Sequence, residues 1–379
     1  MMTPRPAARS RVVYAAYLVG VAILAGYALF LGVRTVSAYN FLKSDHRGFK
    51  GKVHRADPEL GFAGVPNSDG WHVFPVGPPL PMHYNADELR VPAGDRSPAP
   101  RKRPFVLALG CSFTYGDACL AEDTFAYRVA EGLGGTALNA GKCAYGLSQM
   151  LILARRLIPR YRPEYVIVQF SPWLVGRGTS GFARSTFGLV PVPYLTLEDG
   201  RVDLEPPPFR ARVFDLPFPR FDNKKRGLRE FLSFFTTAAA PLFLHDDAAM
   251  ALYEARRLAG RSPNAARQEA EKKGEDVNRV VYRDIVQMAR DNGATVVLLR
   301  LSHPLERHHQ ELKELYKDVV YVDAQATLDA AVRGDDRDAY YRRFGHWRGS
   351  PPVLVDTHPN PEAHAIIARE VLAKLQAQR

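Results

Sequence analysis

Short apolar runs alternate with amphipathic stretches between residues 105 and 170. The runs at 105–109, 136–139 and 165–170 have the length and the residue types of buried strands, and the stretches at 124–133 and 148–158 between them have a helical pattern. Strands that alternate with helices over so short a distance indicate right-handed crossovers and a parallel sheet covered on both faces. We therefore predict an α/β fold for this part of the chain.

The alternation stops after Trp173 and resumes about a hundred residues later. Proline-rich loops and two helical stretches, near 228–238 and 248–258, fill an expected insertion at about 174–275, which is either a cap over the carboxyl edge of the sheet or an oligomer surface. The pattern then predicts helices at 276–291 and 307–316, and strands at 295–301 and 319–322. A last apolar run at 353–355 precedes a closing helix at 361–375.

The N-terminal part contains the longest uncharged apolar run. Residues 12–33 are long enough to cross a bilayer as a helix, which takes about 20 residues. A cleaved signal peptide is the alternative, since small residues follow at 36–38, but its apolar core is usually shorter. We expect a transmembrane anchor with residues 1–11 as a cytoplasmic tail, residues 34–103 as a Pro/Gly-rich lead-in segment, and residues 104–379 outside the cytoplasmic membrane.

The formal net charge of +11 over 379 residues changes this picture little. The basic residues are scattered, and no nucleic-acid-binding motif accompanies them, so we predict a solvated basic surface and no nucleic-acid partner. Three cysteines cannot form a disulfide framework and no C-x-x-C pair suggests zinc, although a bond between Cys119 and Cys143 stays open.

The candidate chemistry begins at Ser112. This serine follows the predicted strand 105–109 and Gly110, so it lies on a turn at the carboxyl end of a strand, where open α/β sheets place their ligands. A serine hydroxyl becomes a good nucleophile when a base takes its proton and a carboxylate orients that base. Asp356 and His358 supply such a pair near the end of the chain.

Three segments together resemble the SGNH (GDSL-type) hydrolases. Residues 110–116 (GCSFTYG) resemble the first block of that family, residues 139–146 (NAGKCAYG) the second, and residues 356–360 (DTHPN) the last. Residues 57–62 and 85–90 resemble lead-in segments of membrane-attached bacterial members. The resemblance covers the chain from about residue 57 to its C-terminus, except for the insertion.

This resemblance implies a flavodoxin-like three-layer α/β/α fold and the hydrolysis or transfer of acyl groups, often acetyl groups on carbohydrate. It makes Ser112 the nucleophile, His358 the general base and Asp356 its orienting carboxylate. The oxyanion would meet the backbone N–H of Ser112 and one N–H of the second block, from Gly141, Ala144 or Gly146. No cofactor and no metal are implied.

The chain departs from the family pattern at three places. Cys111 stands where the family has an aspartate, and Ala144 stands for the glycine of the second block, with Gly141 and Gly146 on either side. Residues 170–173 (FSPW) lack the asparagine of the third block. Gln169, Ser171 or a residue of the insertion is then expected to replace that donor. The Asp-x-His spacing matches SGNH-like alginate acetylation proteins, which brings acyl transfer into consideration.

We therefore predict a membrane-anchored serine acyl-ester hydrolase whose substrate is an acylated glycan or lipid of the bacterial cell envelope. Two alternatives remain open, an O-acyltransferase that uses the same site and a catalytically silent module that binds a polysaccharide or assembles an export complex. The histidines His303, His308 and His309 are expected in a solvated loop rather than in a metal site.

Overall fold

The computed structural model describes residues 7–43, 48–93, 95, 102–185, 188–198, 201–216, 227–258, 263–301, 319–332 and 336–378. At its centre is a five-stranded parallel sheet with the order β15-β14-β9-β7-β8. The strands are β7 (Phe105–Leu109), β8 (Thr136–Asn139), β9 (Tyr165–Phe170), β14 (Thr295–Arg300) and β15 (Val320–Asp323). This is the 2-1-3-4-5 order of flavodoxin-like sheets, whose switch point lies between the first and third strands, β7 and β9.

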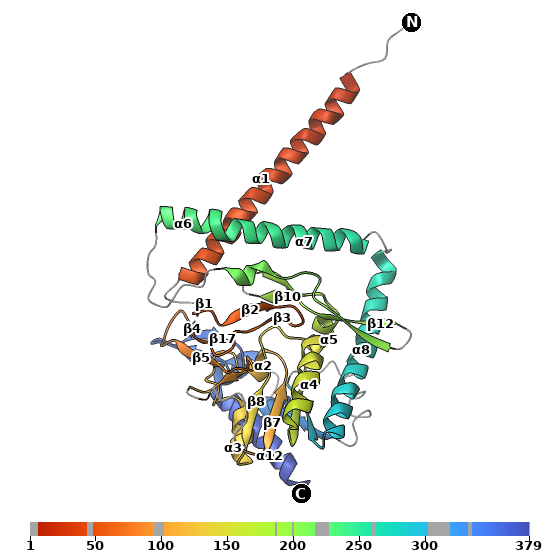
Figure 1. The fold of residues 1–379 in the computed structure, drawn as a ribbon. Coiled ribbons are helices and arrows are strands. Elements are labelled where there is room, and N and C mark those ends of the chain that lie inside the picture. Colours follow the sequence, from red (N-terminus) through yellow and green to blue (C-terminus); the bar gives the residue numbers. More distant parts are fainter. Residues whose placement is uncertain are drawn as a thin grey trace.

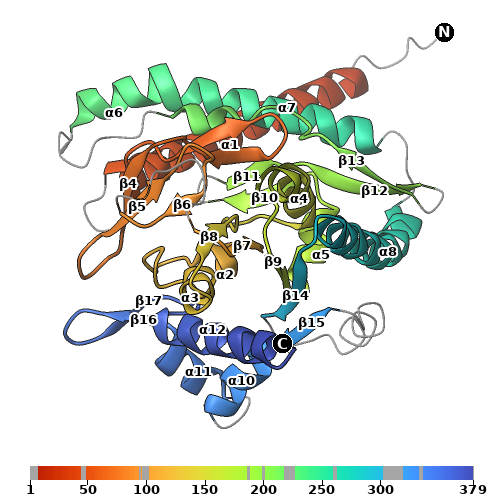
Figure 2. The ribbon, with the colours of Figure 1, turned by 60° about the horizontal axis from the view of Figure 1, so that its bottom comes forward.

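Helices cover both faces of this sheet, as Figure 2 shows. One face packs against α3 (Phe125–Gly132), α10 (Ala324–Ala331) and α12 (Pro361–Gln376), and the other against α4 (Leu147–Tyr161), α5 (Trp173–Gly178) and α8 (Pro263–Asp291). Successive strand residues alternate between the two cores: Leu107 and Leu109 belong to one, Val106 and Ala108 to the other. The strands are apolar throughout because neither face meets water. The predicted three-layer α/β/α fold is confirmed.

The lead-in segment folds as two small antiparallel sheets. One has the order β1-β4-β5-β6, from β1 (Gly48–Lys50), β4 (Asp69–Val73), β5 (Leu80–Tyr84) and β6 (Arg90–Val91). The other pairs β2 (His54–Asp57) with β3 (Gly61–Gly64). Arg90 on β6 is buried and donates hydrogen bonds to the carbonyl oxygens of Tyr115 and Gly116, which joins this segment to the turn that carries Ser112.

The insertion contains strands as well as the predicted helices. The hairpins β10 (Phe182–Ser185) with β11 (Gly188–Pro191), and β12 (Tyr194–Glu198) with β13 (Arg201–Glu205), precede a short 3-10 helix, η1 (Arg212–Asp215). The helices α6 (Leu228–Phe234) and α7 (Ala240–Leu258) are joined through a π-helical turn, η2 (Phe235–Ala239). These helices run across the top of the domain in Figure 1, where they cross and contact α1.

Two details near the C-terminus differ from the sequence pattern. The strand expected at 353–355 is present as β17 (Val353–Asp356), but it pairs antiparallel with β16 (His346–Arg348), outside the central sheet, after α11 (Arg337–Phe344). Helix α8 begins at Pro263, earlier than the expected residue 276, although its end at Asp291 agrees. The helix expected at 307–316 lies outside the described residues, as do His303, His308 and His309.

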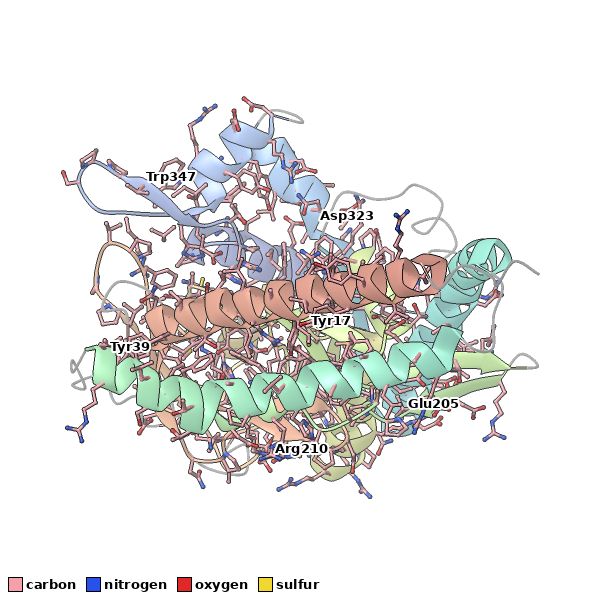
Figure 3. The ribbon with its side chains drawn as sticks, turned by 90° about the horizontal axis from the view of Figure 1, so that it is seen from above. Tyr17, Tyr39, Glu205, Arg210, Asp323 and Trp347 are labelled. Carbon is pink, nitrogen blue, oxygen red and sulfur yellow. The ribbon has the colours of Figure 1, made fainter. Side chains whose placement is uncertain are left out.

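Helix α1 (Ala7–Lys43) is a candidate membrane span that extends beyond the predicted residues 12–33. Its first part projects away from the domain, and large apolar side chains such as Leu24 and Leu29 are exposed there (Figure 1). From Leu31 onward one side of the helix is buried against the domain. Tyr39, labelled in Figure 3, meets the ring of Phe231 of α6 edge-on, with ring centroids 5.4 Å apart.

Candidate active site

Ser112 is the first residue of α2 (Ser112–Tyr115), a single turn that begins directly after β7 and the Gly110-Cys111 step. A β-carbon at Gly110 would lie 2.1 Å from Oγ1 of Thr114 and 2.4 Å from Oε1 of Gln169, so only glycine fits. The turn ends at Gly116, which has φ = 74°, a left-handed conformation that favours glycine. The two glycines let the chain turn sharply enough to leave Ser112 at the carboxyl edge of the sheet.

Gln169, near the end of β9, holds this turn in place. Its Oε1 accepts hydrogen bonds from the backbone N–H of Cys111, at 3.0 Å, and from the Thr114 hydroxyl, at 2.7 Å. Its Nε2 donates to the Ser171 hydroxyl at 2.7 Å, and that hydroxyl donates to the carbonyl of Leu301. Both side chains that were expected to replace the third-block asparagine are therefore engaged inside the fold.

Cys111 is fully buried, and its sulfur lies between the serine and the third-block segment. The Ser112 hydroxyl is 3.9 Å from Sγ of Cys111, and the indole N–H of Trp173 donates to the same sulfur at 3.4 Å. The Trp173 ring also packs on Phe113, with centroids 5.1 Å apart. The cysteine thus occupies the aspartate position of the resembled family as a weak hydrogen-bond acceptor.

The Asp356–His358 pair has the geometry of an oriented base. Oδ1 of Asp356 is 2.7 Å from Nδ1 of His358 and also accepts the backbone N–H of that histidine at 2.7 Å. The pair lies where β17 ends, just before Asn360, which caps α12 by accepting the N–H of Ala363. When the imidazole is neutral, this arrangement keeps its proton on Nδ1 and leaves Nε2 as the acceptor.

Ser112 and the Asp356–His358 pair lie at the same edge of the fold. The ring of Phe113, next to Ser112, meets the His358 ring edge-on with centroids 5.4 Å apart. Among the hydrogen bonds of the described residues, none joins the Ser112 hydroxyl to His358. The structure therefore places Ser112 and His358 on the same side of the fold, without a direct hydrogen bond between their side chains.

A carboxylate that the sequence pattern did not single out completes the group. One ligand atom each of Asp117, Asp356 and His358 lie within 4.8 Å of one another. Asp117 follows Gly116, accepts the thiol of Cys143 at 3.3 Å and lies 3.6 Å from Nδ1 of His72. Its Oδ1 is buried without a hydrogen-bond partner. Its one sequence signal is its place directly after the first block.

These charges set the protonation of His358. Burial alone lowers the pKa of the ring, but the hydrogen bond to Asp356 and the charges of Asp117 and Asp356 outweigh burial and raise that pKa to about 9. The carboxyl of Asp356 has its pKa raised by burial and lowered more strongly by His358, so it stays ionised. His358 is therefore mostly protonated at neutral pH, and it becomes a base in alkaline solution.

Among the described residues, the side chains of Asp117, Asp356 and His358 form a cluster that could bind a metal ion. However, Oδ1 of Asp356 and Nδ1 of His358 are already bonded to each other. A metal would have to replace this bond, so the geometry fits an acid–base pair better than a metal centre.

The three second-block candidates for the oxyanion differ in what their N–H groups do. The N–H of Gly141 donates to Oδ1 of Asn139 at 3.0 Å, and that of Gly146 donates to Oε1 of Gln149 at 2.9 Å. No hydrogen bond among the described residues uses the N–H of Ser112 or of Ala144. Ala144 also has φ = 65°, a conformation unusual for a residue with a β-carbon.

The cysteines are free thiols. Cys119 donates to the carbonyl of Pro359 at 3.4 Å, whereas Cys143 donates to Asp117. The disulfide between Cys119 and Cys143 that the sequence left open is therefore not formed in this structure. Burial raises the pKa of the Cys119 thiol to about 12, so this group is not a reactive thiolate.

No family model matches the chain, and no curated protein is similar to it in sequence. Solved structures with partial similarity include a G-D-S-L family protein from Desulfitobacterium hafniense, which is 11% identical over 72% of this chain and 99% of its own, with a TM-score of 0.34. An acetylxylan esterase from Geobacillus stearothermophilus is 9% identical over 72% of this chain and 94% of its own, with a TM-score of 0.35. At these values the similarity carries no argument, and the fold rests on the strand order.

Proposed function

We propose that this protein is an SGNH-type acyl-ester hydrolase that uses Ser112, His358 and Asp356. The observation that supports this most directly is the doubly hydrogen-bonded Asp356–His358 pair, which lies beside Phe113 at the carboxyl edge of β7. A serine on a sharp turn and an oriented imidazole at a sheet switch point are the two elements that nucleophilic acyl transfer requires.

In the proposed reaction, Ser112 Oγ attacks the acyl carbonyl carbon while Nε2 of His358 accepts the serine proton. Asp356 keeps Nδ1 protonated and stabilises the imidazolium that forms. The oxyanion accepts hydrogen bonds from the backbone N–H groups of Ser112 and Ala144, since the N–H groups of Gly141 and Gly146 donate to other side chains. His358 then protonates the departing alcohol, and a water molecule activated by the same base releases the carboxylic acid and restores Ser112.

We further propose that α1 anchors the enzyme in the cytoplasmic membrane, with the domain on the outer side. The apolar stretch of α1 has a mean hydropathy of 2.1, and 6% of this stretch is buried. Two ion pairs tie its lower half to the insertion, Arg34 to Asp247 and Lys43 to Glu230, each at 2.6 Å. Such a position suits a substrate in the cell envelope, an O-acylated, most simply O-acetylated, glycan or lipid.

Two observations favour the alternative of a catalytically silent binding module. The raised pKa of His358 leaves little free base at pH 7, and Gln169 and Ser171 are both engaged in the fold. An acyltransferase would use the same side chains, with a sugar hydroxyl in the place of water.

Labelling of the full-length protein with a fluorophosphonate tests for a reactive serine. We expect stoichiometric modification of Ser112 at pH 8.5, loss of labelling in Ser112→Ala and in His358→Ala, and release of acetate from an acetylated oligosaccharide. The matched control is His83→Ala, since His83 pairs with Asp69 on the lead-in sheet, away from the site. A folded protein that shows neither labelling nor turnover would establish the silent module. Formation of an acetylated acceptor instead of acetate would establish the transferase.

A further inference from the structure

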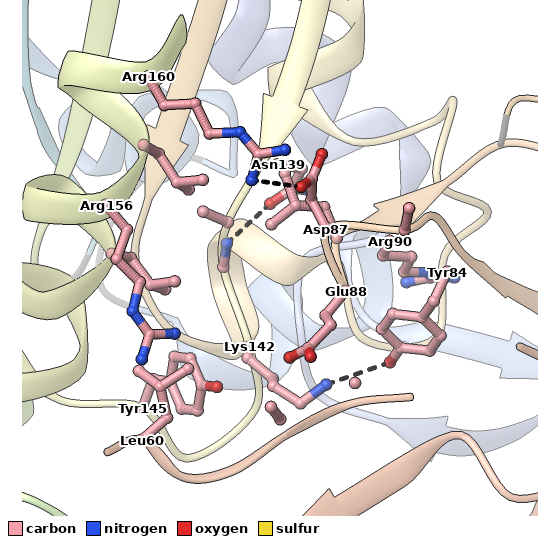
Figure 4. Close-up of a pocket in the computed structure, with 18 residues that line it drawn as sticks. Leu60, Tyr84, Asp87, Glu88, Arg90, Asn139, Lys142, Tyr145, Arg156 and Arg160 are labelled. Atoms are coloured by element: carbon pink, nitrogen blue, oxygen red, sulfur yellow. Dashed lines mark hydrogen bonds and ion pairs between the residues drawn. The ribbon is translucent and has the colours of Figure 1, made fainter. Parts of the chain in front are cut away.

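A cavity of about 220 Å³ lies between the lead-in segment, the second-block loop and α4 (Figure 4). Its wall comes from residues 60–64 and 84–90, from residues 139–145, and from the face of α4 that carries Arg156 and Arg160. None of Ser112, Asp356 and His358 lines it. The space is several times larger than a single water molecule requires, and smaller than a typical pocket for a large ligand.

Lys142 points its ammonium group into this cavity. The residue is 5% exposed, and its Nζ makes one long hydrogen bond, 3.4 Å to the hydroxyl of Tyr84. The ammonium also faces the rings of Tyr84, at 4.7 Å, and Tyr115, at 5.9 Å. Among the described residues no carboxylate forms an ion pair with it. A buried ammonium with two unused N–H donors is costly unless an anion or a polar group meets it.

Lys142 forms no ion pair with another described residue of the wall, although the charge of Glu88 favours its protonated form at longer range. The other charged side chains are paired: Asp87 with Arg160, Glu88 with Arg55, and Arg156 with Glu59. Arg90, which is 4% exposed, gives its terminal nitrogens to backbone carbonyls, and its Nε has no partner. Although burial lowers the pKa of Lys142 to about 8, it remains mostly protonated at pH 7. The cavity therefore favours an anion.

The remaining wall is apolar and indicates what that anion carries. The cavity is also lined by Tyr84 and Tyr145 and by four leucines, Leu60, Leu89, Leu153 and Leu157. We propose that this cavity binds a short-chain carboxylate, with its carboxylate group on Nζ of Lys142 and its alkyl chain against these leucines. One free ammonium matches the single charge of a carboxylate better than the two charges of a phosphate, and an apolar wall of this size fits an alkyl chain of a few carbons.

The test uses saturation-transfer difference NMR on the full-length protein in detergent micelles. Sodium butyrate is the ligand, n-butanol is the uncharged ligand of the same length, and empty micelles provide the blank. We expect saturable transfer to butyrate and none to n-butanol, and Lys142→Met should weaken butyrate binding roughly tenfold or more, because a charge-assisted hydrogen bond is lost. Lys102→Met, at an exposed lysine, is the matched control and should bind butyrate as the unmodified protein does.

His358→Ala separates this cavity from the proposed active site, because it removes the imidazolium beside Ser112. Butyrate binding that survives in His358→Ala and is lost in Lys142→Met supports the cavity site, whether or not Ser112 reacts with a fluorophosphonate. Binding that is lost in His358→Ala, or unchanged in Lys142→Met, would overturn it. Two results with the folded wild-type protein would also overturn the proposal: equal binding of n-butanol and butyrate, or no saturable binding of butyrate. Neither result depends on how well a variant folds.

Discussion

A carboxylate oxygen of Asp117 and a ring nitrogen of His358 lie within 4.8 Å of each other, although Asp117 belongs to the turn after β7 and His358 follows β17. The imidazole therefore has two carboxylates near it, Asp356 in direct contact and Asp117 at longer range. Both favour the charged form of the ring against the effect of its burial. Asp117 thus adjusts how basic the candidate catalytic histidine is.

Replacing this second carboxylate should move the pH dependence of the reaction. His358 must be neutral to accept the serine proton, so with a pKa of about 9 the rate should rise with pH up to that value. In Asp117→Asn the pKa of His358 falls, and the rising limb of kcat/KM moves to lower pH, with a higher rate at pH 7. The pH of the rising limb is measured by following the hydrolysis of p-nitrophenyl acetate from pH 6 to 10. Asp276→Asn, at a carboxylate that pairs with Arg279 on α8, should leave the limb in place. An unmoved limb in Asp117→Asn would refute the role.

A different histidine should make the fold sensitive to acid. His364 on α12 is fully buried, its Nδ1 accepts the N–H of Phe125 at 3.2 Å, and burial lowers its pKa to about 3. Because the unfolded chain binds this proton near pH 6.5, stability is lost as the pH falls below that value, by about 2 kcal/mol at pH 5. Urea unfolding of wild type and His364→Asn at pH 7 and pH 5 tests this, since the asparagine keeps an acceptor for Phe125. Equal losses in both proteins would contradict it.

Most of the sheet could be predicted because its signals are local. The runs at 105–109, 136–139 and 165–170 match β7, β8 and β9, since strands buried on both faces are apolar throughout. The strand at 353–355 was also recognised, but an apolar run does not specify its pairing partner. Its place in a hairpin with β16 depends on the residues 346–348, whose composition gives no strand signal.

The parts that could not be predicted depend on contacts between distant residues. Hydropathy marks the apolar part of α1, whereas its continuation to Lys43 is stabilised by Asp247 and Glu230, some two hundred positions away. Asp117 directly follows the first block, but this position does not indicate its role, because an aspartate after a glycine is ordinary in a turn. Its importance arises only when β17 brings His358 back to the same edge. Ser112, Asp356 and His358 could be identified from the sequence because they lie in motifs. The distances between their side chains could not be predicted from it.

The exposed leucines of the helix pair α6 and α7 provide a test of the proposed membrane attachment. Leu228, Leu232, Leu244 and Leu252 are between 45% and 74% exposed. They belong to α6 and α7, which lie beside α1 (Figure 3). We expect this surface to lie on the lipid headgroups. With NBD attached to Leu244→Cys or Leu252→Cys in nanodiscs, doxyl-labelled lipid should quench the fluorescence. NBD on Gln376→Cys, at the far end of α12, should not be quenched. Equal quenching of NBD on α7 and on α12 would exclude a membrane-facing α7.

Trp173 carries a side-chain N–H donor and lies in the segment 170–173, where the third-block asparagine is absent. Its indole N–H now points to Sγ of Cys111, a weak acceptor, so a developing oxyanion could take over this hydrogen bond at little cost. Trp173→Phe retains an aromatic ring against Phe113 and removes only the donor. Since one oxyanion donor contributes about 10²–10³-fold in turnover, we expect kcat to fall by about two orders of magnitude with KM little changed.

The matched control is Trp347→Phe, because Trp347 on β16 also donates its indole N–H, in this case to the carbonyl of Tyr341, away from the site. That variant should keep full activity. If Trp173→Phe also keeps full activity, the oxyanion is met by backbone N–H groups alone, and the loss of the asparagine is not compensated by a side chain. A rise in KM at constant kcat would instead place Trp173 in substrate binding, because uniform binding lowers KM without accelerating the chemical step.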